Sequence, residues 1–173
     1  TLKGPETPKG MWSWKAVRDR AEEVTTEALA ARQAECHYDD VINIQYTSGT
    51  TGSPKGAMLT HRNLIANTYN WLAAVPQAAR DRTLVMAPMF HAAGSNGILG
   101  AIWMGSRQVS LGAFDPMMAL DLIEKPAINI ALGVPTMWAA MAEEQHSNPR
   151  NTSSLEILAH GGSPIATEVI RRI

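Results

Sequence analysis

A run of eleven residues, Tyr46 to Gly56 (YTSGTTGSPKG), combines hydroxyl groups, glycines and a lysine without any carboxylate. Glycine can adopt positive φ, and it lets an anion approach backbone N–H groups without a Cβ in the way. Three threonines and two serines add short hydroxyl donors, and Lys55 adds one full positive charge near the end of the run. Together these groups suit the binding of phosphates.

Two known phosphate-binding patterns do not fit this run. The Walker A pattern needs Gly-Lys-Ser/Thr, whereas Lys55 stands between a proline and a glycine. The dinucleotide pattern G-x-G-x-x-G has a different glycine spacing. A Ser/Thr/Gly-rich linker is the remaining alternative, but apolar segments flank the run on both sides. Residues 42–46 alternate apolar and polar as in a half-buried strand, and Thr60 is placed to cap a helix that begins near His61.

The run, with the Leu59-Thr60-His61 that follows it, resembles the signature of the adenylate-forming superfamily, which comprises acyl-CoA synthetases, luciferases and adenylation domains. The resemblance implies a loop that holds the β- and γ-phosphates of ATP while a carboxylate attacks the α-phosphorus. Lys55 and Thr47 are then the expected catalytic residues. The expected phosphate-binding residues are Thr47, Ser48, Gly49, Thr50, Thr51, Gly52 and Lys55.

A second motif, Pro88-Met89-Phe90-His91, follows an apolar segment, residues 84–87, that indicates a buried strand. A lone histidine is usually structural, but α/β folds bind ligands just beyond the carboxyl ends of their strands. The quartet also resembles the second motif of the acyl-CoA synthetases, in which an aromatic–His pair borders the acyl pocket. The resemblance therefore implies that Phe90, His91 and Gly94 border such a pocket.

Two further glycine patterns leave alternatives open. Gly94, Gly97 and Gly100 recur every three residues within an apolar segment. This spacing indicates a helix whose small face either leaves room for an acyl chain or packs closely on a neighbouring helix. Later, a predicted strand leads into a turn that resembles the adenine-contacting turn of the family, although alone it is typical of any strand-to-helix turn. The implied adenine-binding residues are Gly161, Gly162, Ser163 and Pro164.

Alternating strands and helices predict an α/β fold with a mostly parallel sheet and flanking helices. Asp115 is expected to cap a helix that starts at Pro116. By resemblance, residues 41–173 are part of the N-terminal domain of an acyl-CoA synthetase, a partial AMP-binding (adenylate-forming) domain, preceded by a helical segment at residues 1–40. The predicted helices cover residues 12–33, 61–75, 94–103, 116–124, 137–144 and 165–173; the strands cover residues 42–46, 84–87, 108–111, 127–132 and 155–160; residues 145–154 form a polar, mobile loop.

Composition limits the class of protein. The chain has 173 residues, 45% hydrophobic and 18% charged, which fits one soluble globular domain with a core. A net charge of −1 gives no reason to expect nucleic acid or an anionic membrane as a partner. The longest apolar run, residues 127–141, is interrupted and too short for a transmembrane segment. The single cysteine, Cys36, cannot form an internal disulfide, and no signal segment is visible, so we expect a cytoplasmic location.

The family pattern continues with an aromatic-Gly-x-Thr-Glu motif, whose glutamate helps to hold magnesium. Neither Thr26-Glu27 nor Thr167-Glu168 follows an aromatic–Gly pair, and Cys36-His37 lacks a second ligand pair at a suitable spacing. We therefore expect no metal ligand in this chain. We also expect the small C-terminal domain, with its adenylation lysine, to be absent, and a fragment of this kind to be inactive alone.

The activity implied for the parent protein is acid–thiol ligation. A carboxylic acid, with a fatty acid preferred, reacts with ATP in the presence of Mg2+ to give an acyl-adenylate, and the acyl group then passes to coenzyme A. A peptide-synthetase adenylation domain is less favoured because no acidic residue stands in residues 87–94. Aryl-CoA ligases, luciferases and a non-catalytic nucleotide-binding fragment stay open. Exposed apolar surface would favour a homodimer.

Overall fold

The computed structural model describes residues 7–48 and 52–172, and the chain divides into two units, Thr1–Asp40 and Val41–Ile173. The first unit contains α1 (Trp14–Asp19), a short 3-10 turn (Ala21–Glu23) and α2 (Thr26–Ala34). Both α-helices begin at hydroxyl caps, because the side chains of Ser13 and Thr25 accept hydrogen bonds from backbone N–H groups three residues later. Within the range 12–33, which was predicted to be helical, the chain forms two α-helices.

The helical segment predicted over residues 12–33 is interrupted. Trp14 and Val17 lie in α1, but Arg20 ends that helix, so the helical spacing does not continue to Val24. The Arg20 guanidinium instead lies over the Trp12 ring, 4.8 Å from its centroid. None of residues 7–40 is buried, so the described part of this unit has no core of its own.

The second unit begins with an antiparallel hairpin of β1 (Val41–Thr47) and β2 (Lys55–Thr60), which forms a separate two-stranded sheet. The strand predicted at residues 42–46 is confirmed, but it does not join the parallel sheet. Parallel pairing needs a crossover of a dozen or more residues, and only residues 48–54 connect these two strands. β2 runs directly into α3 (His61–Ala74).

The main sheet has four strands in the order β4-β3-β5-β6, and every neighbouring pair is parallel. This confirms the predicted α/β fold with a parallel sheet and flanking helices. The strands are β3 (Arg82–Val85), β4 (Arg107–Ser110), β5 (Ile130–Gly133) and β6 (Ile157–His160); the helices that follow them in turn are α4 (Ala92–Met104), α5 (Pro116–Glu124), α6 (Pro135–Ser147) and α7 (Thr167–Arg172).

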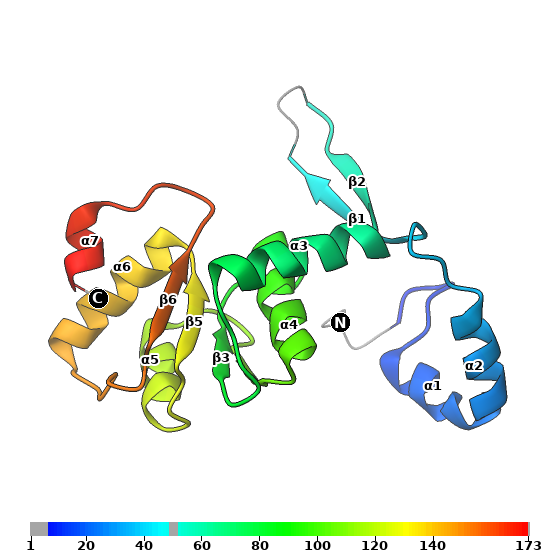
Figure 1. Ribbon diagram of the computed structural model, residues 1–173, viewed down its shortest axis with the longest axis horizontal. Helices are drawn as coiled ribbons and strands as arrows, with labels where there is room; N and C mark the ends of the chain where they lie inside the picture. Colours follow the sequence, from blue (N-terminus) through cyan, green and yellow to red (C-terminus); the bar gives the residue numbers. More distant parts are fainter. Residues whose placement is uncertain (1–6, 49–51, 173) are drawn as a thin grey trace. The chain divides into compact units, whose positions relative to one another are not determined.

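Helices cover both faces of this sheet. The step from β3 to β4 and the step from β4 to β5 run in opposite directions, so right-handed crossovers place α4 and α5 on opposite faces. Accordingly α3 packs on α4, and α5 packs on α6 (Figure 1). The core on the α5–α6 face is apolar throughout and consists of Leu84, Met86, Ala119, Leu120, Ile123, Ile128, Ala131, Trp138 and Met141.

The start of β5 differs from the prediction. Residues 127–129 were expected to be strand, but Ala127 adopts a φ of +53° and terminates α5. The N–H of Ala127 donates to the carbonyl of Glu124, and the N–H of Ile128 donates to the carbonyl of Ile123. This is the bonding of a Schellman cap with Ala127 in the left-handed position. The apolar pattern continues through the cap because Ile128 is buried there.

The loop after α6 also differs from the prediction, because it is anchored rather than mobile. The Arg150 guanidinium donates to Glu144 (2.6 Å) and to Asp121 (3.0 Å). The Gln145 side-chain amide pairs with both backbone groups of Arg150, at 3.0 and 2.7 Å. The hydrogen bonds to Glu144 and then Asp121 raise the pKa of the Arg150 guanidinium above its ordinary value. The loop is therefore tied to α5 and α6.

Candidate functional site

Thr47 and Lys55 form the last residue pair of the hairpin before its connecting loop. Paired residues project from the same face of a sheet, so both side chains share the face that carries Gln45 and Ala57. Both residues are exposed. The hairpin thus presents a hydroxyl and an ammonium group side by side at the base of the predicted phosphate loop.

The opposite face of the hairpin is apolar and explains Gly56. Ile44 and Tyr46 lie on this face, and a Cβ at Gly56 would stand 2.8 Å from Cγ2 of Ile44 and 3.3 Å from Cζ of Tyr46. Gly56 therefore lets these two side chains lie across β2. From the sequence, Gly56 was predicted only to be part of the phosphate loop, and only the strand register reveals its packing role.

Within the loop, Gly52 has a φ of +114°, a conformation that side chains rarely adopt; apart from its chain neighbours, no atom of the described residues lies within 4 Å of its Cβ position. Position 52 therefore requires glycine because of its backbone conformation and not because a side chain would clash. Ser48 is exposed. The other predicted phosphate ligands, Gly49, Thr50 and Thr51, lie outside the described residues.

The junction of the hairpin with α3 is rigidly defined by a capping box. The Thr60 hydroxyl accepts a hydrogen bond from the Asn63 N–H at 3.2 Å, and the Asn63 side-chain oxygen accepts one from the Thr60 N–H at 3.0 Å. The predicted cap at Thr60 is confirmed. Since β2 ends at Thr60 and α3 starts at His61, the orientation of the hairpin strand is coupled to the helix.

Phe90 and His91 lie beyond the carboxyl end of β3. The neighbouring strands β3 and β5 are followed by α4 and α6, which lie on opposite faces of the sheet. Ligands of open α/β sheets bind at such a switch point. Phe90 is 87% exposed. His91 caps α4, because its Nδ1 accepts a hydrogen bond from the Ala93 N–H at 3.2 Å. A neutral imidazole then carries its proton on Nε2, which stays available as a donor.

The glycine face of α4 is packed against protein. A Cβ at Gly94 would lie 2.3 Å from the carbonyl oxygen of Pro88, so glycine is needed where α4 starts against the turn that carries His91. The Cβ position of Gly97 faces Leu132 at 3.8 Å, and that of Gly100 faces Trp71 at 2.8 Å. Of the two alternatives left open by the sequence, the structure supports close packing.

The predicted adenine turn follows β6 at the same edge of the sheet. Gly162 has a φ of +89°, and Gly161, Ser163 and Pro164 are exposed. The Cβ position of Gly162 lies 3.7 Å from Cγ1 of Val134, so the turns after β5 and β6 are neighbours. Among residues 7–48 and 52–172, no hydrogen bond or ion pair joins this edge to the hairpin. Contacts among the described residues place the two turns next to each other, but none of these contacts places the hairpin next to the turns.

A family model described as AMP-binding enzyme matches residues 3–173 of the chain. The chain belongs to this family. A feruloyl-CoA synthase from Amycolatopsis sp is 41% identical over 135 residues, covering 78% of this chain and 28% of that protein. A long-chain-fatty-acid–CoA ligase from Bacillus subtilis (strain 168) is 32% identical over 148 residues, covering 83% of this chain and 26% of that ligase. The chain thus spans less than a third of the length of these curated relatives.

The solved structures agree with this membership. ATP-bound MatB from Rhodopseudomonas palustris aligns with a TM-score of 0.71 at 27% identity, covering 80% of this chain and 27% of that one. The resemblance to adenylate-forming enzymes, inferred from Tyr46 to Gly56, is therefore confirmed. The fold is that of part of an adenylate-forming N-terminal domain.

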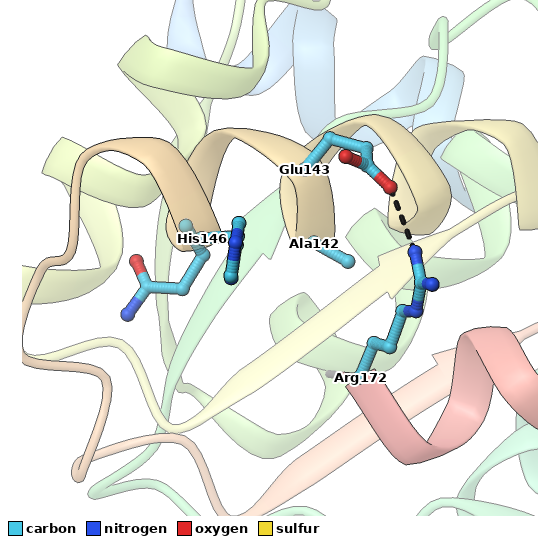
Figure 2. Close-up of a pocket in the computed structure, with 5 residues that line it drawn as sticks. Ala142, Glu143, His146 and Arg172 are labelled. Carbon is cyan, nitrogen blue, oxygen red and sulfur yellow. Dashed lines mark hydrogen bonds and ion pairs between the residues drawn. The ribbon is translucent and has the colours of Figure 1, made fainter.

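A cavity of about 500 Å³ lies away from the motif residues. It is formed between α6 and α7, where Arg172 and Glu143 are joined by an ion pair of 2.8 Å (Figure 2). None of the predicted site residues lines it. Its lining residues are Ala142, Glu143, Gln145, His146 and Arg172.

Two structural findings bear on cofactors and membranes. In the described ranges 7–48 and 52–172, no three His, Cys, Asp or Glu side chains gather as a metal-binding group. Every helix in the same ranges is too short or too polar to cross a bilayer.

Proposed function

We propose that this AMP-binding enzyme is an ATP-dependent acid–thiol ligase that makes acyl-CoA. The observation that carries the proposal is the pairing of Thr47 with Lys55 at the base of the Ser/Thr/Gly loop. The chain belongs to a family described as AMP-binding enzyme, which fits this pairing. The pair offers one hydroxyl donor and one full charge on a single face. Those groups suit two neighbouring phosphate oxygens.

In the first half-reaction, a carboxylate oxygen of the acid attacks the α-phosphorus of ATP. The bond from the α-phosphorus to the bridging oxygen breaks, and pyrophosphate leaves with the electron pair. Lys55 neutralises charge on the β- and γ-phosphates, while Thr47, Ser48 and the glycine-rich backbone position them. In the second half-reaction, the thiolate of coenzyme A attacks the acyl carbon, and AMP leaves. Mg2+ supplies charge neutralisation on the phosphates when bound.

The proposed acyl end of the site is the switch point between β3 and β5. His91 presents Nε2–H there, and Phe90 presents an exposed aromatic face. The turn from Gly161 to Pro164, on the far side of Val134, offers exposed backbone to the adenine. Gly94 acts by holding α4 against Pro88, and it is a positioning residue in this proposal.

For the acid, we propose an aryl carboxylic acid first and a fatty acid second. The sequence-based preference for a fatty acid rested on the glycines after His91, and those glycines pack on Pro88, Leu132 and Trp71. The feruloyl-CoA synthase relative also has the higher identity, 41% against 32% for the fatty-acid ligase.

The test is an acid panel with the full-length protein, ATP, Mg2+ and coenzyme A. Ferulate and palmitate stand for the two acid classes, and formation of AMP and of the thioester is measured by mass spectrometry. More thioester from ferulate than from palmitate supports the proposal of an aryl acid. More thioester from palmitate would show that the acid substrate belongs to the fatty-acid class. ATP binding without AMP formation from any acid would instead establish a non-catalytic nucleotide-binding module.

A further inference from the structure

Helices α3 and α4 connect the two ends of the proposed ligase site. α3 begins directly after Thr60, where the hairpin strand β2 ends, and α4 begins directly after its cap His91. The two helices pack on each other (Figure 1). Their contact is therefore a structural route between the phosphate end of the site, at the hairpin, and the acyl end, at His91.

Two contacts fix how α4 lies against α3. The Nδ2 atom of Asn67 donates a hydrogen bond to Oδ1 of Asn96 at 2.6 Å. The Cβ position of Gly100 lies 2.8 Å from Cδ1 of Trp71, so the indole packs directly on the glycine. On both helices the second contact comes four residues, or about one turn, after the first. Together the two contacts set both the rotation of α4 and its position along α3.

The position of α4 in turn determines the position of His91. The Nδ1 atom of His91 accepts the Ala93 N–H at 3.2 Å, which ties the imidazole to the first turn of the helix. A Cβ at Gly94 would stand 2.3 Å from the Pro88 carbonyl oxygen, so this turn also packs closely on the segment that carries His91. A slide of α4 would therefore move the imidazole, by about 1.5 Å for each residue of slide.

The position of α3 is tied to the hairpin at its other end. β2 runs from Lys55 to Thr60, and no loop separates it from α3. The capping box of Thr60 and Asn63 closes this junction from both sides. A displacement of β2 is therefore passed to α3, because the chain between them has no segment that could absorb it.

We propose that Asn67 and Asn96 are positioning residues that couple the hairpin to His91. Their hydrogen bond holds α4 in one register on α3, so the imidazole keeps one place relative to Lys55. The roles of Lys55 and His91 as ligands of phosphate and acid rest on the proposed function. Asn67 is exposed and Asn96 is half-buried, so loss of their bond should alter position more than thermal stability.

The first test needs no ligand and uses NMR of the full-length protein labelled with 15N-histidine. The His91 imidazole signals are assigned through His91→Asn. Thr60→Ala, at the hairpin end of α3, is expected to shift these signals in otherwise wild-type protein and to leave them unchanged in an Asn67→Ala background. Asn70→Ala, at an exposed position of the same helix, is the control background and should preserve the shift.

Two results of this first test would overturn the proposal. One is the absence of any His91 shift from Thr60→Ala in otherwise wild-type protein. The other is a shift of the same size in the Asn67→Ala background, which would show that the helices transmit the change without the asparagine pair. Asn96→Asp keeps an acceptor for Asn67 and is expected to behave as wild type.

The second test separates this proposal from the proposed function. Binding of α,β-methylene-ATP to the full-length protein is measured with and without the acid that the enzyme turns over. The acid should tighten binding by about 5-fold in wild-type protein and in Asn96→Asp, and should have almost no effect in Asn67→Ala. Binding of the nucleotide alone should be equal in all three proteins.

The two ideas fail in different ways. If the wild-type protein turns over acid but Asn67→Ala keeps the full effect of acid on nucleotide binding, the coupling is refuted and the ligase function stands. If no acid is turned over while Thr60→Ala still shifts His91 only when Asn67 is present, the ligase function is refuted and the positional coupling stands.

Discussion

Thr47 and Lys55 face each other across the hairpin as its final register pair, on the face opposite Tyr46 and Ile44. Both residues lie at strand ends and not in the loop itself, so backbone pairing fixes their spacing. In the proposed function, an anion held by this pair would therefore be positioned by the strands. The apolar side chains lie on the other face, so the polar pair and the apolar packing occupy separate faces of the hairpin.

Replacing Lys55 with alanine is expected to lower kcat/KM for ATP by about 100-fold, because a charge that stabilises the leaving pyrophosphate is lost. Thermal stability should change little, since Lys55 is exposed. The measurement is acid-dependent exchange of pyrophosphate into ATP by the full-length protein. Lys125→Ala, at an exposed position after α5, is the control and should retain activity. Equal activity of the two variants would remove Lys55 from the proposed site.

His91 caps α4, and in the proposed function it also donates a hydrogen bond toward the acid. His91→Ala should cost about 1 kcal/mol of stability through loss of the cap. His91→Asn retains a capping side chain and should recover most of that stability while still losing activity. Chemical denaturation and thioester formation, measured on both variants, check this prediction. Full activity in His91→Asn would show that the residue acts only as a cap.

Gly94 and Gly97 form a matched pair on one helix. Gly94→Ala places a Cβ 2.3 Å from the Pro88 carbonyl oxygen, and backbone must move, so we expect a loss of about 1–3 kcal/mol. Gly97→Ala meets no atom closer than 3.8 Å and should gain about 0.5–1 kcal/mol from higher helix propensity. Urea unfolding of both variants tests the pair. Similar effects at the two positions would contradict the close approach at Gly94.

Ala127→Gly is expected to stabilise the protein by about 0.5–1 kcal/mol. Ala127 holds a φ of +53°, which costs an L-residue free energy that glycine does not pay. The measurement is the free energy of unfolding in urea. Ala66→Gly, at an exposed position inside α3, is the control and should lose about 1 kcal/mol. Destabilisation by both substitutions would rule out the left-handed cap.

Arg150→Met should release residues 148–154 from α5 and α6 and lower the Tm. It leaves Glu144 and Asp121 without their guanidinium partner, although methionine keeps much of the apolar stem. The pKa of the Arg150 guanidinium is raised above its ordinary value. The contribution of this group to folding stability is therefore fully present below the ordinary pKa and is lost only in strong alkali. Hydrogen exchange at Asn151 reports the release. Arg172→Met, in an exposed ion pair, should change the Tm little.

The sequence predicted those parts of the fold that depend on local chemistry. Thr60 and Asp115 were identified as caps because short polar side chains before an apolar periodic segment have few other roles. The parallel sheet followed from the alternation of strands and helices. Residues 127–129 were predicted to be part of a strand because a Schellman cap can be formed by buried apolar residues, which leave no polar residue in the sequence to mark the end of the helix.

Candidate site residues could be named from the sequence, but their arrangement could not. Phosphate chemistry could be inferred from the residues around Lys55, but the hairpin register that pairs it with Thr47 depends on strand geometry. The role of Gly94 could not be separated from that of an acyl-chain lining, because small residues satisfy both. Only the position of the Pro88 carbonyl distinguishes them. The anchoring of Arg150 joins groups up to 29 positions apart, beyond any local pattern.

The separation of the hairpin from the four-stranded sheet has a consequence for its thermodynamics. No residue of β1 or β2 is buried, so breaking their ladder exposes none of the apolar core around Trp138. The hairpin amides should therefore exchange through openings that cost less than global unfolding. Nucleotide bound at Thr47 and Lys55 would protect these amides while leaving the slowest-exchanging core amides unchanged. If the proposed phosphate site is correct, the hairpin is expected to be a foldon that its ligand orders.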